Sequence, residues 1–247
     1  LLMKLASFRF PILDFSRGIM ILIMIIYHGW YLLSNVFNVL PALENGVINQ
    51  LLTGIWGAIF VFIAWFSAAI THNKRVEIKW TKESFARYCL KRAAILMIIA
   101  GAITFLTGKF EPDQLILFWI LHFFAMAFLI LPLFVSLGRW NWLVGFLVAL
   151  VWIFFFSRIF PVDYLWFFGV RSASFTSADY YPLFPYFWVI LLGFEGGKWL
   201  LKHEKMIQLF SREIPWSLLI RWMGRQSLVI YILHVPVLYW IFWIFFQ

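Results

Sequence analysis

Long apolar runs separated by short polar segments dominate the hydrophobic pattern of the chain. Seven of these runs are each close to the ~20 residues that a helix needs to cross the hydrocarbon core of a bilayer. They cover residues 10–33, 49–71, 86–107, 115–136, 140–160, 183–201 and 226–246. The pattern therefore predicts an all-α fold, a polytopic membrane helix bundle of about seven transmembrane helices, with residues 1–247 forming a single domain.

The amino-acid composition supports an integral membrane protein. Of the 247 residues, 64% are hydrophobic and only 13% are charged, a balance that an ordinary soluble domain could not cover with polar surface. The aromatic content of 22% suits a bundle that carries Trp and Tyr at both membrane interfaces. The multi-pass chain is thus expected to have the lipid bilayer as its surroundings.

Basic residues fall almost entirely in every second connection between the apolar runs. Only Lys109, Arg158 and Arg171 lie in the other connections, and Arg17 lies just inside the first run. Because basic residues accumulate in cytoplasmic loops, this pattern predicts a cytoplasmic N-terminus and a C-terminus on the outer side. The net charge of +9 is thereby explained without a nucleic-acid partner.

The first apolar run carries three ionisable residues. Arg17 and His28 are eleven residues apart, so they lie on one helix face roughly 16 Å apart along the axis. Asp14 precedes Arg17 by three residues, within reach for a side-chain pair. Ionisable groups in a span usually face the interior of the bundle or a wet cavity. The alternative is that Asp14 and Arg17 anchor the inner end and His28 caps the outer one.

Two further histidines lie inside later apolar runs. His122 is expected about seven residues inside the outer end of its helix, at a depth similar to that of His28. Imidazole groups can serve as acid or base near neutral pH, so the two histidines form a candidate site. The alternative for each is a buried histidine bonded to a carbonyl. For His234, just before Pro236, this structural role is favoured because a proline frees a backbone carbonyl.

The outer connection 161–182 is the longest and is rich in aromatic residues. Within it, Asp179 is placed to orient a histidine or bind an amine, or else to cap the next helix together with Ser177. Near the inner end of that helix, Glu195 is expected to pair with Lys198. The histidines do not share the spacing of a metal site, so no metal is expected.

Five sequence blocks together resemble one family. The block LDFSRGIMILIMIIYH is similar to the first-helix signature of the bacterial branch of the heparan-alpha-glucosaminide N-acetyltransferase catalytic-domain family, which belongs to the transmembrane acyltransferase group. The later blocks that match in order are FARYCLKRAAILMIIAGAITFLT, FWILHFFAMAFLILPLF, SADYYPLFPYFWVILLGFEGGK and MGRQSLVIYILHVPVL. Leu32 stands where the family often has an acidic residue. The loop of residues 34–48 lacks the histidine found there in the animal branch.

The resemblance implies an acyltransferase that moves an acetyl group from cytoplasmic acetyl-CoA to an amine or hydroxyl of an amino sugar or glycan on the outer side. It would act either through a histidine base or through an acetyl-histidine on His28. The residues expected to act in catalysis are His28, His122 and Asp179. Those expected to serve the donor are Arg17, Asp14, Arg92 and Arg225. Those expected on the acceptor side are Tyr180, Tyr181, Trp166 and His234.

The resemblance also implies that the protein lies in the cytoplasmic membrane of a prokaryote, and it is compatible with a homodimer. Two other classes fit the polar residues within the spans. One is a proton-coupled transporter or flippase in which Arg17, His28, His122 and His234 line a path through the membrane. The other is a non-catalytic membrane subunit that keeps the fold in order to bind a partner. Turnover of acyl-CoA separates both from an enzyme.

Overall fold

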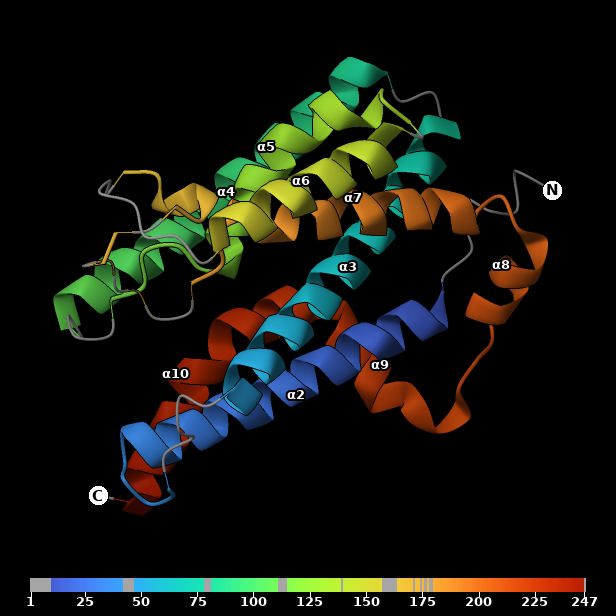
Figure 1. Cartoon of the computed structure of the whole chain (residues 1–247). Helices are drawn as coiled ribbons and strands as arrows, with labels where there is room; N and C mark the ends of the chain where they lie inside the picture. Colours follow the sequence, from blue (N-terminus) through green and yellow to red (C-terminus); the bar gives the residue numbers. More distant parts are fainter. Residues whose placement is uncertain are drawn as a thin grey trace. The chain divides into compact units, whose positions relative to one another are not determined.

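Helices make up all the regular secondary structure in the part of the chain that the structure, a computed structural model, describes. This part comprises residues 10–41, 47–77, 81–110, 115–138, 140–156, 164–170, 172, 173, 175, 177 and 180–246. The helices are α2 (Pro11–Asn35), α3 (Val47–Glu77), α4 (Lys82–Phe110), α5 (Ile120–Val135), α6 (Trp140–Phe156), η2 (Trp166–Phe168), α7 (Leu183–Leu200), α8 (Glu204–Phe210), η3 (Pro215–Ser217), α9 (Leu218–Arg225) and α10 (Ser227–Phe246) (Figure 1). The prediction of an all-helical fold is confirmed for these residues.

Several helices are long and apolar enough to cross a membrane. By length and composition, four stretches of the described chain qualify: α2, residues 54–73 of α3, residues 83–109 of α4, and α10. The helices α5 and α6 are apolar but shorter. Each of the seven predicted runs overlaps one of the long helices α2 to α7 and α10. A multi-pass membrane protein follows, whereas the number of crossings and the sides of the termini stay predictions.

The start of α5 differs from the prediction. The apolar run begins at residue 115, but the helix begins at Ile120. The backbone before it bonds instead to the long loop, since Leu117 N–H donates to Ser177 Oγ (3.0 Å) and Phe118 C=O accepts from Tyr181 N–H (2.9 Å). Hydropathy cannot separate a buried extended segment from a buried helix. The expected position of His122, about seven residues inside the end of its helix, is therefore wrong, because His122 lies in the first turn of α5.

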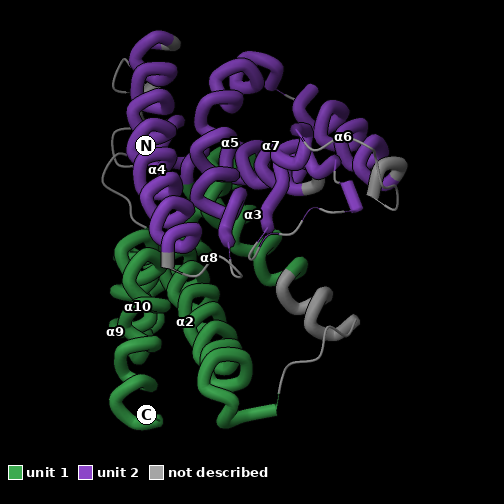
Figure 2. The backbone as a smooth tube through the Cα atoms, turned by 90° about the vertical axis from the view of Figure 1, so that its left-hand side faces the viewer, with its two compact units in different colours: residues 1–67, 199–247 green, residues 68–198 purple. Residues whose placement is uncertain are grey.

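The described chain divides into two compact units. Unit 1 comprises residues 1–67 and 199–247, and unit 2 comprises residues 68–198, so that α3 contributes to both (Figure 2). The prediction of a single domain stays a prediction.

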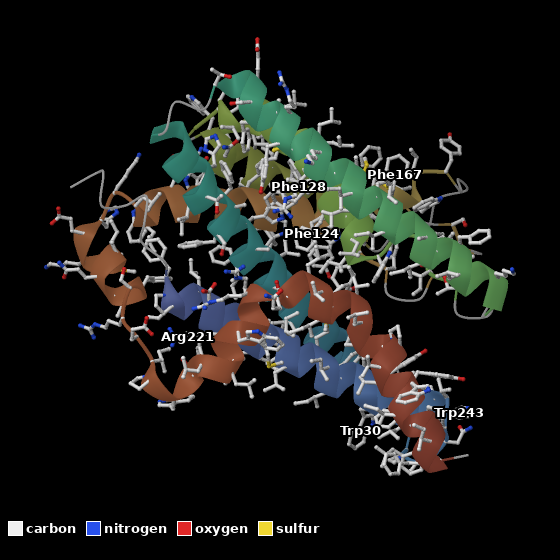
Figure 3. All side chains as sticks on the ribbon, turned by 180° about the vertical axis from the view of Figure 1, so that it is seen from behind. Trp30, Phe124, Phe128, Phe167, Arg221 and Trp243 are labelled. Carbon is white, nitrogen blue, oxygen red and sulfur yellow. The ribbon has the colours of Figure 1, made fainter. Side chains whose placement is uncertain are left out.

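In unit 1, α2 packs against α9 and α10. Two glycines allow the backbones of α2 and α9 to approach closely. A Cβ atom on Gly18 would lie 1.9 Å from Ile220 O, and one on Gly224 would lie 1.8 Å from Asp14 O. No residue with a side chain fits at such a crossing. Trp30 of α2 and Trp243 of α10, both labelled in Figure 3, lie toward the same end of the α2–α10 pair.

In unit 2, the pair of α4 and α5 and the helix α7 supply most of the buried apolar side chains. Small residues such as Ala93, Ala100 and Ala125 are almost fully buried and allow close packing. Inside α7, Phe184 has an extended backbone (φ −87°, ψ 126°) because Pro185 follows it. Gly169 ends η2 with a φ of 101°, and a Cβ there would lie 2.6 Å from Phe184 O. The long loop is thus fastened to the start of α7.

Candidate functional site

A buried carboxylate joins two helices of unit 1. Asp14 Oδ1 accepts a hydrogen bond from Arg17 Nη2 at 2.5 Å, one turn along α2. Its other oxygen, Oδ2, accepts from Arg225 Nε of α9 at 3.2 Å. The Asp14 side chain is only 12% exposed, and charge-assisted hydrogen bonds of this kind are stronger than neutral ones. The predicted pairing of Asp14 with Arg17 is confirmed, and the contact with Arg225 is an addition to it.

Two histidines meet further along α2, where this helix packs against α10. The rings of His28 on α2 and His234 on α10 have their centroids 4.8 Å apart and stand nearly perpendicular, at 79°. His234 is buried, whereas His28 is partly exposed and also contacts the Tyr27 ring edge-on. Both positions were candidates from the sequence, but no spacing rule paired them with each other.

The hydrogen bonds of this pair determine where the protons lie. His28 Nδ1 lies 2.9 Å from Met24 O, and His234 Nδ1 lies 2.6 Å from Tyr231 O. A carbonyl oxygen only accepts hydrogen bonds, so Nδ1 of each ring donates. In the neutral imidazoles, Nε2 then carries the lone pair and can act as a base. His234 Nε2 is buried and has no hydrogen-bond partner among the described residues. The carbonyl that His234 Nδ1 contacts belongs to Tyr231. It is not the carbonyl that Pro236 leaves without a donor, which the sequence suggested.

In unit 2, His122 lies against a layer of aromatic rings. Its ring stacks on Phe118 (centroids 5.6 Å apart, 21° between planes), and Phe118 contacts Trp166 edge-on at 5.6 Å. Trp166 in turn stacks on Phe175 at 6.2 Å. His122 is buried, and its Nδ1 has no hydrogen-bond partner within the described chain. The arrangement joins the start of α5 to the long loop.

The loop brings three of the four predicted acceptor-side residues to this layer, whereas the fourth, His234, lies on α10 in unit 1. Tyr180 donates its hydroxyl hydrogen to Trp166 O, and its ring contacts Phe175. Tyr181 is fixed through its backbone to Phe118, and its ring lies 5.2 Å from that of Tyr186 on α7. Trp166 and Tyr180 therefore belong to the aromatic layer beside His122, and Tyr181 is joined to it through its backbone bond to Phe118.

The comparison with known families decides the relationship that the sequence blocks suggested. The family described as "Heparan-alpha-glucosaminide N-acetyltransferase, catalytic" matches residues 9–236. The chain belongs to this family. No curated protein and no solved structure matched the chain. Family membership and the membrane-spanning helices together indicate a membrane acetyltransferase.

The other predicted site residues of this acetyltransferase-family member lie in both units or outside the described residues. Asp179 lies outside the described residues. Ser177 lies six residues before α7 and accepts the Leu117 N–H, so it does not cap that helix. Arg92 is exposed on α4 in unit 2, with its guanidinium 5.5 Å from the centre of the Tyr88 ring. Arg17 and Arg225, in contrast, share one carboxylate in unit 1.

Two groups of polar contacts were not predicted from the sequence. In unit 2, Asn141 is 1% exposed, and its Nδ2 donates to Phe134 O (3.0 Å) and to Glu195 Oε1 (2.7 Å). Glu195 also accepts from Lys198 at 2.8 Å, which confirms that predicted pair. In unit 1, Arg221 pairs with Glu213. The sequence carried a signal for each group. One is an asparagine in the otherwise apolar stretch WNWLVGFLVAL. The other is the presence of an arginine next to a glycine in the dipeptides Arg17-Gly18 and Gly224-Arg225.

Histidines and carboxylates, both possible metal ligands, occur in each of the two units. Within the residues that the structure describes, no group of three or more His, Cys, Asp or Glu side chains is arranged to hold a metal ion.

Proposed function

We propose that this protein transfers an acetyl group from acetyl-CoA to an amine or hydroxyl of an amino sugar or glycan. In this proposal it acts in the cytoplasmic membrane of a prokaryote, as a bundle of about seven spans with its N-terminus in the cytoplasm. The observation that carries the proposal is the His28–His234 pair, two imidazoles with Nε2 free to act as a base. Family membership supplies the reaction class.

In the proposed reaction, His28 is the general base. Its Nε2 takes the proton from the acceptor nitrogen or oxygen as that atom attacks the thioester carbonyl carbon. A new bond from this atom to the acetyl carbon forms, the carbon–sulfur bond breaks, and the thiolate of CoA leaves. The thiolate then takes the proton from His28, which returns to its neutral form. The Nδ1–H bond to Met24 O holds the ring in the required tautomer throughout.

A covalent route uses the same atom. His28 Nε2 attacks the thioester carbon directly, the carbon–sulfur bond breaks, and the CoA thiolate leaves an acetyl-imidazolium behind. The acceptor atom then attacks the acetyl carbon, the carbon–nitrogen bond to His28 breaks, and the proton of the acceptor passes to the thiolate. Both routes place positive charge on His28 at some stage. His234, whose ring lies 4.8 Å away, would orient His28 and stabilise that charge through its Nε2 lone pair.

Other predicted residues take binding roles in the proposal. Arg17 and Arg225, held by Asp14, would bind the anionic donor. On the acceptor side, the aromatic layer of Trp166 and Tyr180, with Tyr181 joined to it, offers flat apolar faces of the kind that pack on sugar rings. His122 and Asp179 would orient the acceptor there.

The test is acetyl transfer by the purified protein in lipid nanodiscs. Radiolabelled acetyl-CoA is supplied with glucosamine-type and hydroxyl acceptors. We expect His28→Gln to lower kcat by roughly 10²- to 10⁴-fold, the usual contribution of a positioned acid–base group. His203→Gln is the matched control, since His203 is exposed before α8, and it should leave kcat unchanged.

Two results would contradict the proposal. One is transfer by the His28 variant at the parent rate with an unchanged melting temperature. The other is a substrate-dependent proton flux in proteoliposomes without any turnover of acyl-CoA, which would favour the transporter. Rapid acid quenching separates the two routes, because only the covalent route leaves radiolabel on the protein.

A further inference from the structure

Arg221 is a buried arginine of α9 that the proposed reaction does not use. It is 6% exposed, and its Nη1 donates to the carboxylate of Glu213. Its Nε atom is buried and has no hydrogen-bond acceptor among the described residues. Glu213 lies on the connection between α8 and η3, and its side chain is 66% exposed. An exposed carboxylate thus supplies the counter-charge of a buried guanidinium.

Arg221 belongs to a group of three arginines at the crossing of α2 and α9. It follows Ile220, whose carbonyl oxygen meets Gly18, and Arg17 directly precedes that glycine. Arg225 lies four residues further along α9, on the same face as Arg221, and bonds to Asp14. Figure 3 labels Arg221 on α9. The close approach of the two backbones therefore gathers guanidinium groups from both helices.

The charges of this crossing do not balance. Three guanidinium groups, those of Arg17, Arg221 and Arg225, are accompanied by two carboxylates, those of Asp14 and Glu213, which leaves an excess of one positive charge. Like Arg221, Arg17 has a buried Nε without an acceptor in the described part of the chain. The Arg225 side chain is 43% exposed, so the cost at this crossing lies in the two buried Nε donors that lack an acceptor and not in a buried net charge. A planar guanidinium fork matches the oxygen atoms of a phosphate.

We propose that Arg17, Arg221 and Arg225 form a phosphate-binding site at the crossing of α2 and α9, and that Glu213 pairs with Arg221 only until a phosphate ester displaces it. Arg17 and Arg225 remain tied to Asp14, which keeps the site from collapsing when the ligand leaves. The proposed function enters only in naming CoA as one bearer of the phosphate. The site itself rests on the three arginines.

The phosphate has two sources, the phosphates of CoA and the headgroup of an anionic phospholipid. Four apolar side chains of η3 and α9 are 54–75% exposed beside the arginines: Trp216, Leu218, Leu219 and Trp222. Such side chains suit the membrane interface, where lipid headgroups and cytoplasmic ligands both reach the protein. The experiment therefore contains one arm for each source.

In the first arm, binding of radiolabelled CoA is measured with the full chain in phosphatidylcholine nanodiscs. We expect Arg221→Gln to weaken binding by roughly 10- to 100-fold, as for a lost charge-assisted hydrogen bond. Glu213→Gln should bind CoA several-fold more tightly, because the competing carboxylate is gone. Arg212→Gln, which removes an exposed arginine of the same connection, should bind like the parent.

The second arm uses native mass spectrometry in nanodiscs that contain phosphatidic acid. Retention of this lipid by the parent, and its loss from Arg221→Gln while CoA binding stays equal, would support the site and assign it to lipid. If the parent neither binds CoA nor transfers acetyl yet retains the lipid through Arg221, the proposed function fails and the site stands. If Arg221→Gln keeps the parent affinity for both probes, the site is overturned.

A purely structural role for Arg221 gives a different result. If Arg221→Gln does not fold, Glu213→Gln decides the matter, because only the exposed partner is changed there. With a parent-like melting temperature, tighter binding of CoA or of phosphatidic acid supports the site. Unchanged or weaker binding of both probes overturns it, since a structural ion pair would not compete with a ligand.

Discussion

The polar groups of the two units are held in place by different means. In unit 1, ion pairs and a histidine pair join helices, and at Gly18 and Gly224 the backbones of α2 and α9 are in contact. In unit 2, His122 lies in an aromatic layer that a long loop completes. Hydrogen bonds at Leu117 and Phe118 and a close backbone approach at Phe184 hold this loop in place. Helix crossings place groups rigidly, whereas loops vary between proteins.

Under the proposed function, this difference suits separate roles for the two units, donor binding in unit 1 and acceptor binding in unit 2. The acetyl donor is constant, so rigid helix crossings in unit 1 can position the base and the phosphate site. The acceptor differs among acetyltransferases, and a loop can change its aromatic residues without disturbing the helices. Substitutions in the two units should therefore fail in different ways.

The largest effect is expected where the backbones touch. Gly224→Ala would place a Cβ 1.8 Å from Asp14 O, and overpacking of this kind costs about 3 kcal/mol. We expect a marked loss of melting temperature and of all acetyl transfer, measured by fluorescence-detected size exclusion after heating. Gly101→Ala is the control, because nothing lies within 4 Å of a Cβ at Gly101 on α4. An equally stable Gly224→Ala would refute the close crossing.

A moderate effect is expected at the polar cluster of unit 2. Asn141→Ala removes the bonds to Phe134 O and Glu195 Oε1, and hydrogen bonds between membrane helices are worth about 1 kcal/mol each. We expect destabilisation by about 1–3 kcal/mol with the KM values of the surviving enzyme unchanged. Equilibrium unfolding and steady-state kinetics check the two parts. A change of kcat greater than tenfold in folded protein would give Asn141 a part in the chemistry.

The smallest effect is expected in the aromatic layer. Trp166→Ala removes one stacked ring, and such contacts are worth about 0.5–1.5 kcal/mol. The KM for the acceptor should rise by roughly 2- to 12-fold, with the KM for acetyl-CoA unchanged. Trp240→Ala, at an exposed tryptophan of α10, is the control. A rise in the KM for acetyl-CoA alone would move the aromatic layer to the donor side.

Local patterns predicted much of the fold and part of the site. The runs of apolar residues predicted all the long helices, and the spacing of three residues predicted the pairs Asp14–Arg17 and Glu195–Lys198. The start of α5 was predicted five residues too early, because the loop takes the backbone bonds of the preceding segment. Asp179 lies outside the described residues, so its role stays a prediction.

By itself, the sequence determined the membrane class, the helices, the short-range ion pairs and the family, since hydropathy, helical spacing and sequence blocks are all local properties. Only the tertiary structure decided that His28 meets His234, that Arg225 reaches Asp14 across 211 positions of the chain, and that Arg221 is buried beside them. The reason is that helices apolar on every side carry little information about which faces meet. Close packing at a few glycines determines which helix faces meet, and this packing exists only in the assembled structure.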